Sequence, residues 1–385
     1  MRVLLGAAIL TLFAAHFACS QAAVPLTFKA VPTPNPNFNN GLAAASASSP
    51  NDIWAVGSAV MHYDGTKWTA FQPANQSQIS TLNGVYTVSP TLAWTAGGSV
   101  SSTGVPGQII EQWNGTQWNV FPGPTFGQND QPAIYTMAGT SADDVWAIGS
   151  LLVNDGFQLD FLFEHWDGQQ WTATTLLADD AFLFGASADS PNDAWAVGFN
   201  GPQNDDSATL AMHFNGSTWS QVSTPSVGTG ANQLNGILAL APNNVWAVGF
   251  STPVPPPQQA ATLTLIEHFD GATWKVVPSP NFGPASIYQS NRLFGLAANS
   301  PDDIWAFGSY FAADGSGHQM TLLLHWNGKS WTIAPGPNPT KGNFLSDLLF
   351  AGVVPSPGDV WLVGAENESP NEGSLAIHSV SPTKR

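Results

Sequence analysis

Histidine is the residue type of this chain best suited to metal binding or acid–base chemistry, and its spacing is regular. A neutral imidazole binds metal ions and exchanges protons near neutral pH. Six histidines recur once per repeat, five of them six residues before the tryptophan of a G-x-x-W motif: His62, His165, His213, His268, His325 and His378. This spacing distributes the imidazoles along the chain, whereas a metal site needs three or four ligands within ~2.3 Å of one ion. We therefore expect a structural role, and assign no metal ligand and no catalytic residue.

Acidic residues recur in step with these histidines. An Asp or Asn stands two residues before the tryptophan of a W-x-x-G motif in six units: Asp52, Asp144, Asp193, Asn244, Asp303 and Asp359. If the two positions lie at the same end of neighbouring antiparallel strands, a hydrogen bond between them satisfies a partly buried imidazole. The sequence therefore predicts one such pair per repeat. His318 falls outside this pattern and is the best single candidate for chemistry, against the alternative of a solvated loop residue.

The elements that carry these residues are repeated β-strands. Seven tryptophans open a W-x-x-G motif: Trp54, Trp94, Trp146, Trp195, Trp246, Trp305 and Trp361. Six others end a G-x-x-W motif: Trp68, Trp118, Trp171, Trp219, Trp274 and Trp331. Short apolar runs separated by Asn-Gly or Asp-Gly dipeptides are typical of strands joined by tight hairpins. Four strands per unit, with 40 to 59 residues between successive W-x-x-G tryptophans, predict a radial β-propeller.

The number of blades follows from the two ends of the pattern. The seventh unit has Trp361 and His378 but no G-x-x-W strand, while Thr27–Pro34 matches Thr273–Pro280 closely. We therefore expect an all-β, seven-bladed β-propeller of four-stranded blades. Its ring would be closed by the N-terminal strand, which completes the last blade and removes the free sheet edges.

Short motifs within the repeats resemble those of known propellers. Asp52-Ile-Trp54-Ala-Val-Gly57 resembles a tectonin repeat, and Asp270-Gly271-Ala-Thr-Trp274 resembles an Asp-box turn with one residue fewer. Gly97-Gly98 resembles the kelch glycine doublet, and Trp94 is the only W-x-x-G tryptophan that such a doublet follows. The chain thus looks like a secreted β-propeller of the kelch, Asp-box and tectonin-like group. The resemblance implies a fold and not an activity, because propellers host unrelated functions.

The N-terminus indicates export. A basic start, an apolar run from Val3 to Ala15 and small residues up to Ala22 are typical of a secretory signal peptide. We expect a signal peptide over 1–23, a propeller over 24–385, and a secreted or periplasmic protein. Cys19 is compatible with a lipoprotein cysteine, but its preceding residues favour a cysteine removed with the signal. No later stretch is long and apolar enough for a membrane span.

Composition excludes several function classes. The formal net charge is −17 with only nine lysines and arginines, so no basic stripe for nucleic acid exists. The region after the expected signal has two arginines, Arg292 and Arg385, too few for a sialidase site. It also lacks the cysteine of a copper-radical oxidase and a G-x-S-x-G nucleophile motif. Carboxylate pairs of a glycoside hydrolase cannot be assigned from sequence, so a carbohydrate-active enzyme remains an alternative.

Binding is the leading interpretation, and the long loops are its expected location. Loops joining strands two to three and four to one share one propeller face, and variable loops on a rigid scaffold commonly bind ligands. The candidate binding residues are Asp155, Asp205, Asp206, Tyr310, Asp314, His318, Glu366 and Glu368, with Glu372 beside them. We expect a monomer that binds a glycan or an extracellular or envelope protein without a cofactor. Calcium bound by the loop carboxylates is an alternative, but the sequence contains no D-x-D-x-D-G loop to support it. A structural role in surface assembly is the other alternative.

Overall fold

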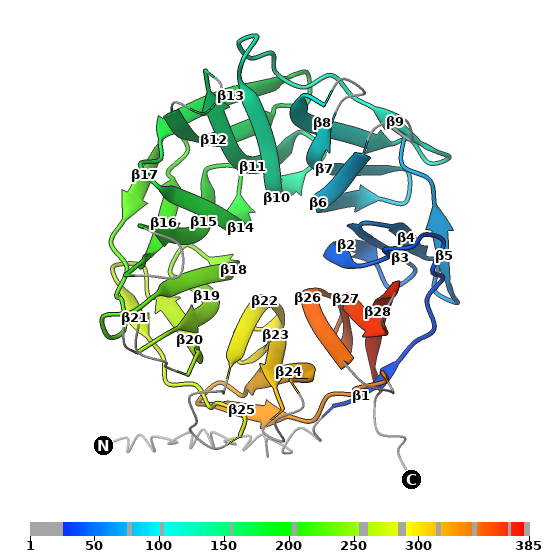
Figure 1. Ribbon diagram of the computed structural model, residues 1–385, viewed down its shortest axis with the longest axis vertical. Helices are drawn as coiled ribbons and strands as arrows, with labels where there is room; N and C mark the ends of the chain where they lie inside the picture. The colour runs from blue at the N-terminus through cyan, green and yellow to red at the C-terminus, as the bar shows by residue number, and fades with distance from the viewer. Residues whose placement is uncertain are drawn as a thin grey trace, which may run out of the picture.

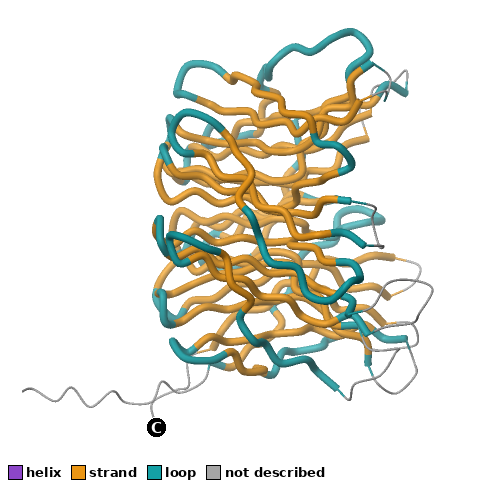
Figure 2. The backbone as a smooth tube through the Cα atoms, turned by 90° about the vertical axis from the view of Figure 1, so that its left-hand side faces the viewer, coloured by secondary structure: helices purple, strands orange, loops and turns teal. Residues whose placement is uncertain are grey.

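The computed structural model describes residues 26–74, 79–100, 104–154, 156, 158–201, 206–253, 261–283, 290–312, 317–340, 345–368 and 371–380. The expected signal peptide and Cys19 lie outside the described residues. Within these ranges the chain is all β, and its sheets are arranged around a central axis (Figure 1). Seen from the side, the strands run between two faces that carry the connecting loops (Figure 2).

Five sheets are separate and four-stranded, each running outward from the axis in chain order. Their strands are β2 (Leu42–Ser49), β3 (Asp52–Gly57), β4 (Val60–Tyr63) and β5 (Trp68–Phe71); β6 (Ile79–Ser89), β7 (Leu92–Val100), β8 (Pro106–Trp113) and β9 (Trp118–Val120); β10 (Gln131–Ser141), β11 (Asp144–Val153), β12 (Gln158–Trp166) and β13 (Trp171–Leu177); β14 (Ala181–Ser190), β15 (Asp193–Asn200), β16 (Ala208–Phe214) and β17 (Trp219–Val222); β18 (Asn232–Ala241), β19 (Asn244–Ser251), β20 (Leu263–Phe269) and β21 (Trp274–Val276).

The remaining eight strands form one sheet, which corrects the predicted architecture. These strands are β1 (Thr27–Ala30), β22 (Asn291–Ser300), β23 (Asp303–Phe311), β24 (Gln319–Trp326), β25 (Trp331–Ala334), β26 (Leu345–Ser356), β27 (Asp359–Glu368) and β28 (Asn371–Val380). A parallel pairing of Gln319 with Ser346 joins β24 to β26. The structure therefore has five separate four-stranded blades, and the prediction of seven is wrong. The repeat pattern counts sequence units, but carries no information on a hydrogen bond that joins two units.

The N-terminal strand closes the ring as the sequence predicted. β1 pairs antiparallel with β28, with Phe28 opposite Ser379. The chain beyond β1 is also fixed, because Asn35 Oδ1 accepts a hydrogen bond from the Ser374 N–H at 2.9 Å. Asn281 does the same for Thr264 at 2.8 Å. The similarity of the Thr27 and Thr273 segments therefore reflects a shared contact, in which an asparagine after the segment accepts a hydrogen bond from the backbone of the third strand of a unit.

Tryptophan pairs form the contacts between successive units. Every W-x-x-G tryptophan is buried, with 0 to 4% of its surface exposed. Trp54 meets Trp118 of the following sheet edge-on, with ring centroids 4.9 Å apart. The other six edge-on pairs of the same kind are Trp94–Trp171, Trp146–Trp219, Trp195–Trp274, Trp246–Trp331, Trp305–Phe28 and Trp361–Trp68. The predicted role of these residues in packing between units is confirmed, and edge-to-face geometry adds to their area burial.

No helix in the described part of the chain is long and apolar enough to cross a membrane.

Candidate functional site

The innermost strand of each unit carries a β-bulge that faces the axis. In β6 the register shifts between Leu82 and Gly84, leaving Asn83 unpaired, and β14 shifts in the same way around Phe184. A bulge bends its strand and redirects one side chain. The bulge residues of the innermost strands are Ala43, Asn83, Tyr135, Phe184, Asn235, Phe294 and Phe350. They all line one cavity on the axis, and we call this set the axial belt.

Glycine next to the bulge permits this close approach of strands. A Cβ added to Gly236 would lie 2.7 Å from the Cα of Gly295 in the neighbouring innermost strand. A Cβ on Gly185 would meet the Asn235 carbonyl oxygen at 2.8 Å. Both distances are too short for any larger residue. Small residues at the axis therefore let the strands converge, and the belt side chains project from the position before them.

The cavity has a volume of about 650 Å³, within the usual range of ligand sites, ~300–1,000 Å³. Four of the seven belt residues are aromatic, and each is half-buried. Phe294 and Phe350 form one tilted pair with centroids 5.2 Å apart, and Tyr135 and Phe184 form a looser pair at 6.3 Å. Among its lining residues the cavity has no charged side chain. The belt is therefore suited to an uncharged ligand with apolar or planar groups.

The belt amides are oriented by bonds to the next innermost strand. Asn83 Nδ2 donates to the Ile134 carbonyl at 2.8 Å. Asn235 Nδ2 donates to the Leu293 carbonyl at 2.7 Å, and its Oδ1 accepts from Gln233 Nε2 at 2.6 Å. These bonds fix which amide atoms are available to a ligand. Each Nδ2 carries two N–H groups, so Asn83 can offer a second donor as well as its Oδ1 acceptor to a partner.

One cationic side chain of an innermost strand contacts an aromatic ring of the neighbouring sheet. Arg292 is half-buried on β22 and lies over the Phe250 ring, 4.5 Å from its centroid. Burial lowers its pKa from the usual value, although an arginine stays protonated at physiological pH. This contact is a cation–π interaction.

The predicted Asp–His pairs are present in all six units that have the residues. His62 and Asp52, for example, share a hydrogen bond of 2.7 Å, and His268 meets Asn244 at 2.9 Å. The other pairs are His165–Asp144, His213–Asp193, His325–Asp303 and His378–Asp359, at 2.6 to 2.9 Å. Each imidazole also stacks on the W-x-x-G tryptophan of its own unit, as Trp361 and His378 do at 4.0 Å. The predicted hydrogen-bonded pairing of these histidines is confirmed.

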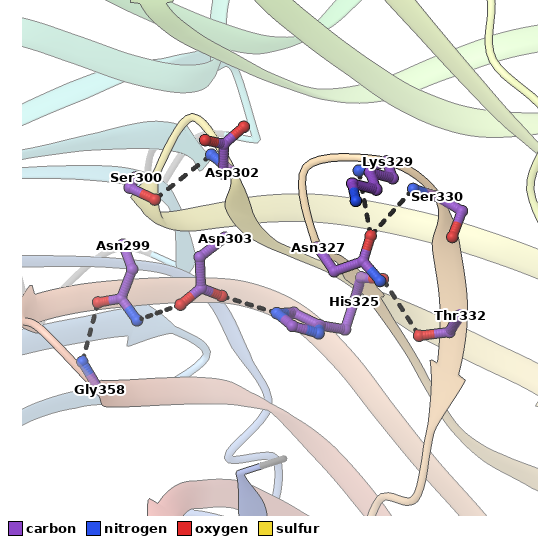
Figure 3. Close-up of polar contacts among 10 residues, drawn as sticks. All are labelled: Asn299, Ser300, Asp302, Asp303, His325, Asn327, Lys329, Ser330, Thr332 and Gly358. Atoms are coloured by element: carbon purple, nitrogen blue, oxygen red, sulfur yellow. Dashed lines mark hydrogen bonds and ion pairs between the residues drawn. The ribbon is translucent and has the colours of Figure 1, made fainter. Parts of the chain in front are cut away.

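One pair is tied to its neighbouring unit (Figure 3). Asn299 Nδ2 donates to Asp303 Oδ2 at 2.9 Å, and Asn299 Oδ1 accepts from the Gly358 N–H at 2.9 Å. The hydrogen bond from His325 holds the pKa of Asp303 below its usual value, partly offset by burial. The pair therefore connects the β22–β23 turn with the β26–β27 turn, within the eight-stranded sheet.

The loop residues predicted to bind are not gathered into one described cluster. Asp155, Asp205 and Asp314 lie outside the described residues, and Glu368 is described by its backbone alone. Asp206 is exposed before β16, while Glu366 lies in β27. Tyr310 lies in β23 and packs against Phe282 at 4.1 Å, while His318 immediately precedes β24, where its carbonyl accepts a hydrogen bond from the Ala312 N–H at 2.8 Å. Burial raises the pKa of Tyr310. In the described ranges no group of three or more His, Cys, Asp or Glu side chains is arranged for a metal ion.

Sequence reasoning missed the axial belt and also two buried carboxyl groups. Glu164 and Glu267 are fully buried between units, and neither oxygen of either carboxyl has a hydrogen-bond partner. Burial raises the pKa of each to about 8, and Gln108 beside Glu164 and Thr209 beside Glu267 offset this only slightly. Both carboxyls are therefore protonated in the folded protein at neutral pH. The belt had a visible signal, since Asn83, Phe184, Asn235 and Phe294 each precede the recurring glycine of the first strand.

Comparisons with known proteins support the propeller fold. No family model and no curated protein matches the sequence. Solved structures that match include YCF48 bound to D1 peptide, at 14% identity and a TM-score of 0.54, covering 94% of this chain and 99% of that one. YCF48 from Cyanidioschyzon merolae matches at 12% identity and 0.53, covering 91% and 98%. The RRP9 WD40 repeats match at 9% and 0.56, covering 91% and 96%. This chain is therefore a β-propeller with WD40-like structural neighbours, and the kelch, Asp-box or tectonin assignment stays a prediction.

Proposed function

We propose that this chain is a non-catalytic binding propeller that receives a segment of a protein partner in its axial cavity. The observation that carries the proposal is the axial belt, in which every innermost strand uses a bulge to present one side chain to the same cavity. A bulge costs ladder hydrogen bonds, and bulges are frequent next to functional sites. Packing alone does not require half-buried aromatic rings at this position.

The chemistry of the lining supports a neutral, largely apolar ligand. Ala44, Val85, Met137 and Ile237 surround the belt aromatics, and the belt amides supply a small number of polar contacts. Apolar walls with few oriented polar groups are usual for ligand sites. None of the lining residues is a carboxylate, histidine, cysteine or lysine, which favours binding over catalysis. The YCF48 structure supports the peptide form of the proposal, because a propeller of similar fold accommodates a peptide.

The long-loop face remains part of the proposal as the rim of the site. The innermost strands start on that face, and the bulges that carry the belt residues lie in the first half of each strand. Asp206, His318 and Glu366 would then contact parts of the partner outside the cavity. A glycan ligand is the alternative, since aromatic rings and amides also bind sugars. Export through residues 1–23 to the periplasm or cell exterior is proposed with it, and mass spectrometry of the exported protein would show a mature start near residue 24.

Capture of ligands by three matched proteins tests the proposal. The wild type, a Phe294→Ala/Phe350→Ala variant and a Val120→Ala/Val276→Ala control are each used for pull-down from envelope extract and on a glycan array. Val120 and Val276 are exposed on outer strands, 56% and 41%, so the control removes similar apolar groups away from the axis. We expect a protein partner that is retained by the control and lost by the belt variant. Retention by the belt variant, or binding of glycans in place of protein, contradicts the proposal.

A further inference from the structure

A second cavity lies beside the axial cavity, between the sheets β6–β9 and β10–β13. Its volume is about 330 Å³, and Asn83 and Tyr135 line both cavities. We call it the side groove. Its walls come from the first three strands of one sheet and the first two strands of the next. The groove therefore adjoins the axial cavity at this pair of sheets.

Glycine keeps the side groove open. A Cβ placed on Gly98 meets no other atom within 4 Å, and one placed on Gly107 meets only the Ser99 hydroxyl at 3.9 Å. Neither residue has the positive φ that would require glycine. Their lack of a side chain is therefore not explained by backbone strain or by packing. Gly98 is the second residue of the Gly97-Gly98 doublet, and the matching position of the first unit is Ser58.

The lining of the groove combines apolar walls with hydroxyl groups. Pro106, Pro132 and Leu152 supply apolar surface, and half-exposed Val100 stands beside them. The Tyr135 hydroxyl and Ser150 Oγ share a hydrogen bond of 2.9 Å. Apart from the phenol of Tyr135, the groove has no ionisable group among its lining residues. This combination matches a planar apolar group that carries one polar atom.

We propose that the side groove takes an aromatic side chain with a polar tip, tyrosine or tryptophan, from the partner segment that occupies the axial cavity. This inference rests on the proposed function. Because Asn83 and Tyr135 line both cavities, the groove lies beside the axial cavity, which argues for a side chain of a bound segment over a separate small molecule. An uncharged groove in a chain of net charge −17 disfavours an acidic residue, which would lose its hydration without gaining a counter-charge. Tyrosine and tryptophan are also the residues that most often anchor an interface in a pocket.

The test fills the groove without disturbing the axial cavity. Linear peptides are selected from a display library on the full-length mature protein, and their affinities are measured for wild type, Gly98→Trp, Ser58→Trp and Phe294→Ala. Ser58 is exposed at the equivalent position of the first sheet, so its variant adds the same ring away from the groove. Thermal unfolding of all four proteins establishes that the fold is retained.

We expect the selected peptides to share a tyrosine or tryptophan. Gly98→Trp should weaken their binding by about tenfold or more, since it excludes an anchoring side chain from its pocket. Ser58→Trp should leave peptide affinity unchanged. Replacing the shared aromatic residue of the peptide by alanine should lower its affinity for the wild type by the same factor. The same replacement should not lower its affinity for Gly98→Trp. Peptides that depend on Phe294 and bind Gly98→Trp normally would overturn the groove assignment and leave the proposed function standing. Peptides insensitive to Phe294→Ala, or no selected peptide at all, would overturn both.

Discussion

Phe28 lies edge-on against Trp305, with ring centroids 5.0 Å apart and an interplanar angle of 77°. The first residue belongs to the N-terminal strand, and the second to β23 of the same eight-stranded sheet. Phe28 occupies the position that a G-x-x-W tryptophan holds in the other units, such as Trp118 against Trp54. The chain therefore closes its ring with the same aromatic contact that joins its other units.

Replacing Phe28 by alanine should weaken this closure. The side chain is buried, with 8% of its surface exposed, and truncating a buried phenylalanine costs ~3–5 kcal/mol. We expect a lower urea midpoint, while Lys29→Ala, at the exposed next position, should leave the midpoint unchanged. Equal midpoints for the two variants would show that β1 is not needed to close the ring. Deletion of residues 24–34 should reduce the yield of soluble protein, because it exposes a sheet edge.

Replacing Trp195 by alanine should cost ~3–5 kcal/mol in free energy of unfolding. Trp195 is 1% exposed and contacts both His213 of its own sheet and Trp274 of the next. The measurement is chemical denaturation followed by circular dichroism, with the exposed Val120→Ala as the control. A loss of only a few tenths of a kcal/mol would mean that the ring is not part of the packing between units.

The Asp303–His325 pair should contribute to stability in a pH-dependent way. The hydrogen bond from His325 lowers the pKa of Asp303 in the folded state. Its contribution is therefore present above the unfolded value of 3.8 and is lost as pH falls through the folded pKa. A double-mutant cycle of Asp303→Asn and His325→Gln at pH 6 should give a coupling of ~0.5–1.5 kcal/mol. A coupling of zero, or one that grows on acidification to pH 3, contradicts this prediction.

Buried Glu164 should make the protein less stable in mild alkali. Its folded pKa of about 8 lies above the ordinary glutamate value of 4.5, so between these pH values the folded state holds a proton that the unfolded state releases. The contribution of Glu164 to stability is then most favourable below pH 4.5 and is lost as pH rises through the folded pKa. Glu164→Gln should flatten this dependence and raise the melting temperature at pH 8.5 relative to wild type. Asp302→Asn, at an exposed acid, is the control, and the same slope for Glu164→Gln as for wild type would contradict the assignment.

Periodic residues made most of the fold predictable. Tryptophan recurs at fixed spacing in all seven units, and histidine with aspartate or asparagine in six of them, each with one repeated physical role. The Asp–His pairs and the closing strand therefore followed from the pattern. The division into sheets did not follow. A parallel pairing of Gln319 with Ser346 joins two units, and no residue type encodes it.

The candidate site was less predictable than the scaffold. The variable loops led us to predict Asp206, Tyr310, His318 and Glu366 as binding residues. The structure does not bring them into one described cluster. The axial belt instead uses the bulge residue of each first strand, which precedes a glycine in only four units and varies in type from Ala43 to Phe350. Only the bulge register shows that these positions face one cavity. Buried Glu164 and Glu267 were also invisible, since a glutamate between apolar strand residues is not distinguishable by spacing from an exposed one.

Photo-cross-linking from the axial belt tests the central claim most directly. A benzoylphenylalanine is placed at Phe350 in one variant and at exposed Val120 in another, each is irradiated in cells, and the adducts are mapped by mass spectrometry. Binding in the axial cavity predicts one dominant adduct from position 350, attached to a defined peptide segment of a protein partner, and none of that segment from position 120. A partner that cross-links from position 120 or from a loop position such as 206, with no adduct from position 350, would contradict the account.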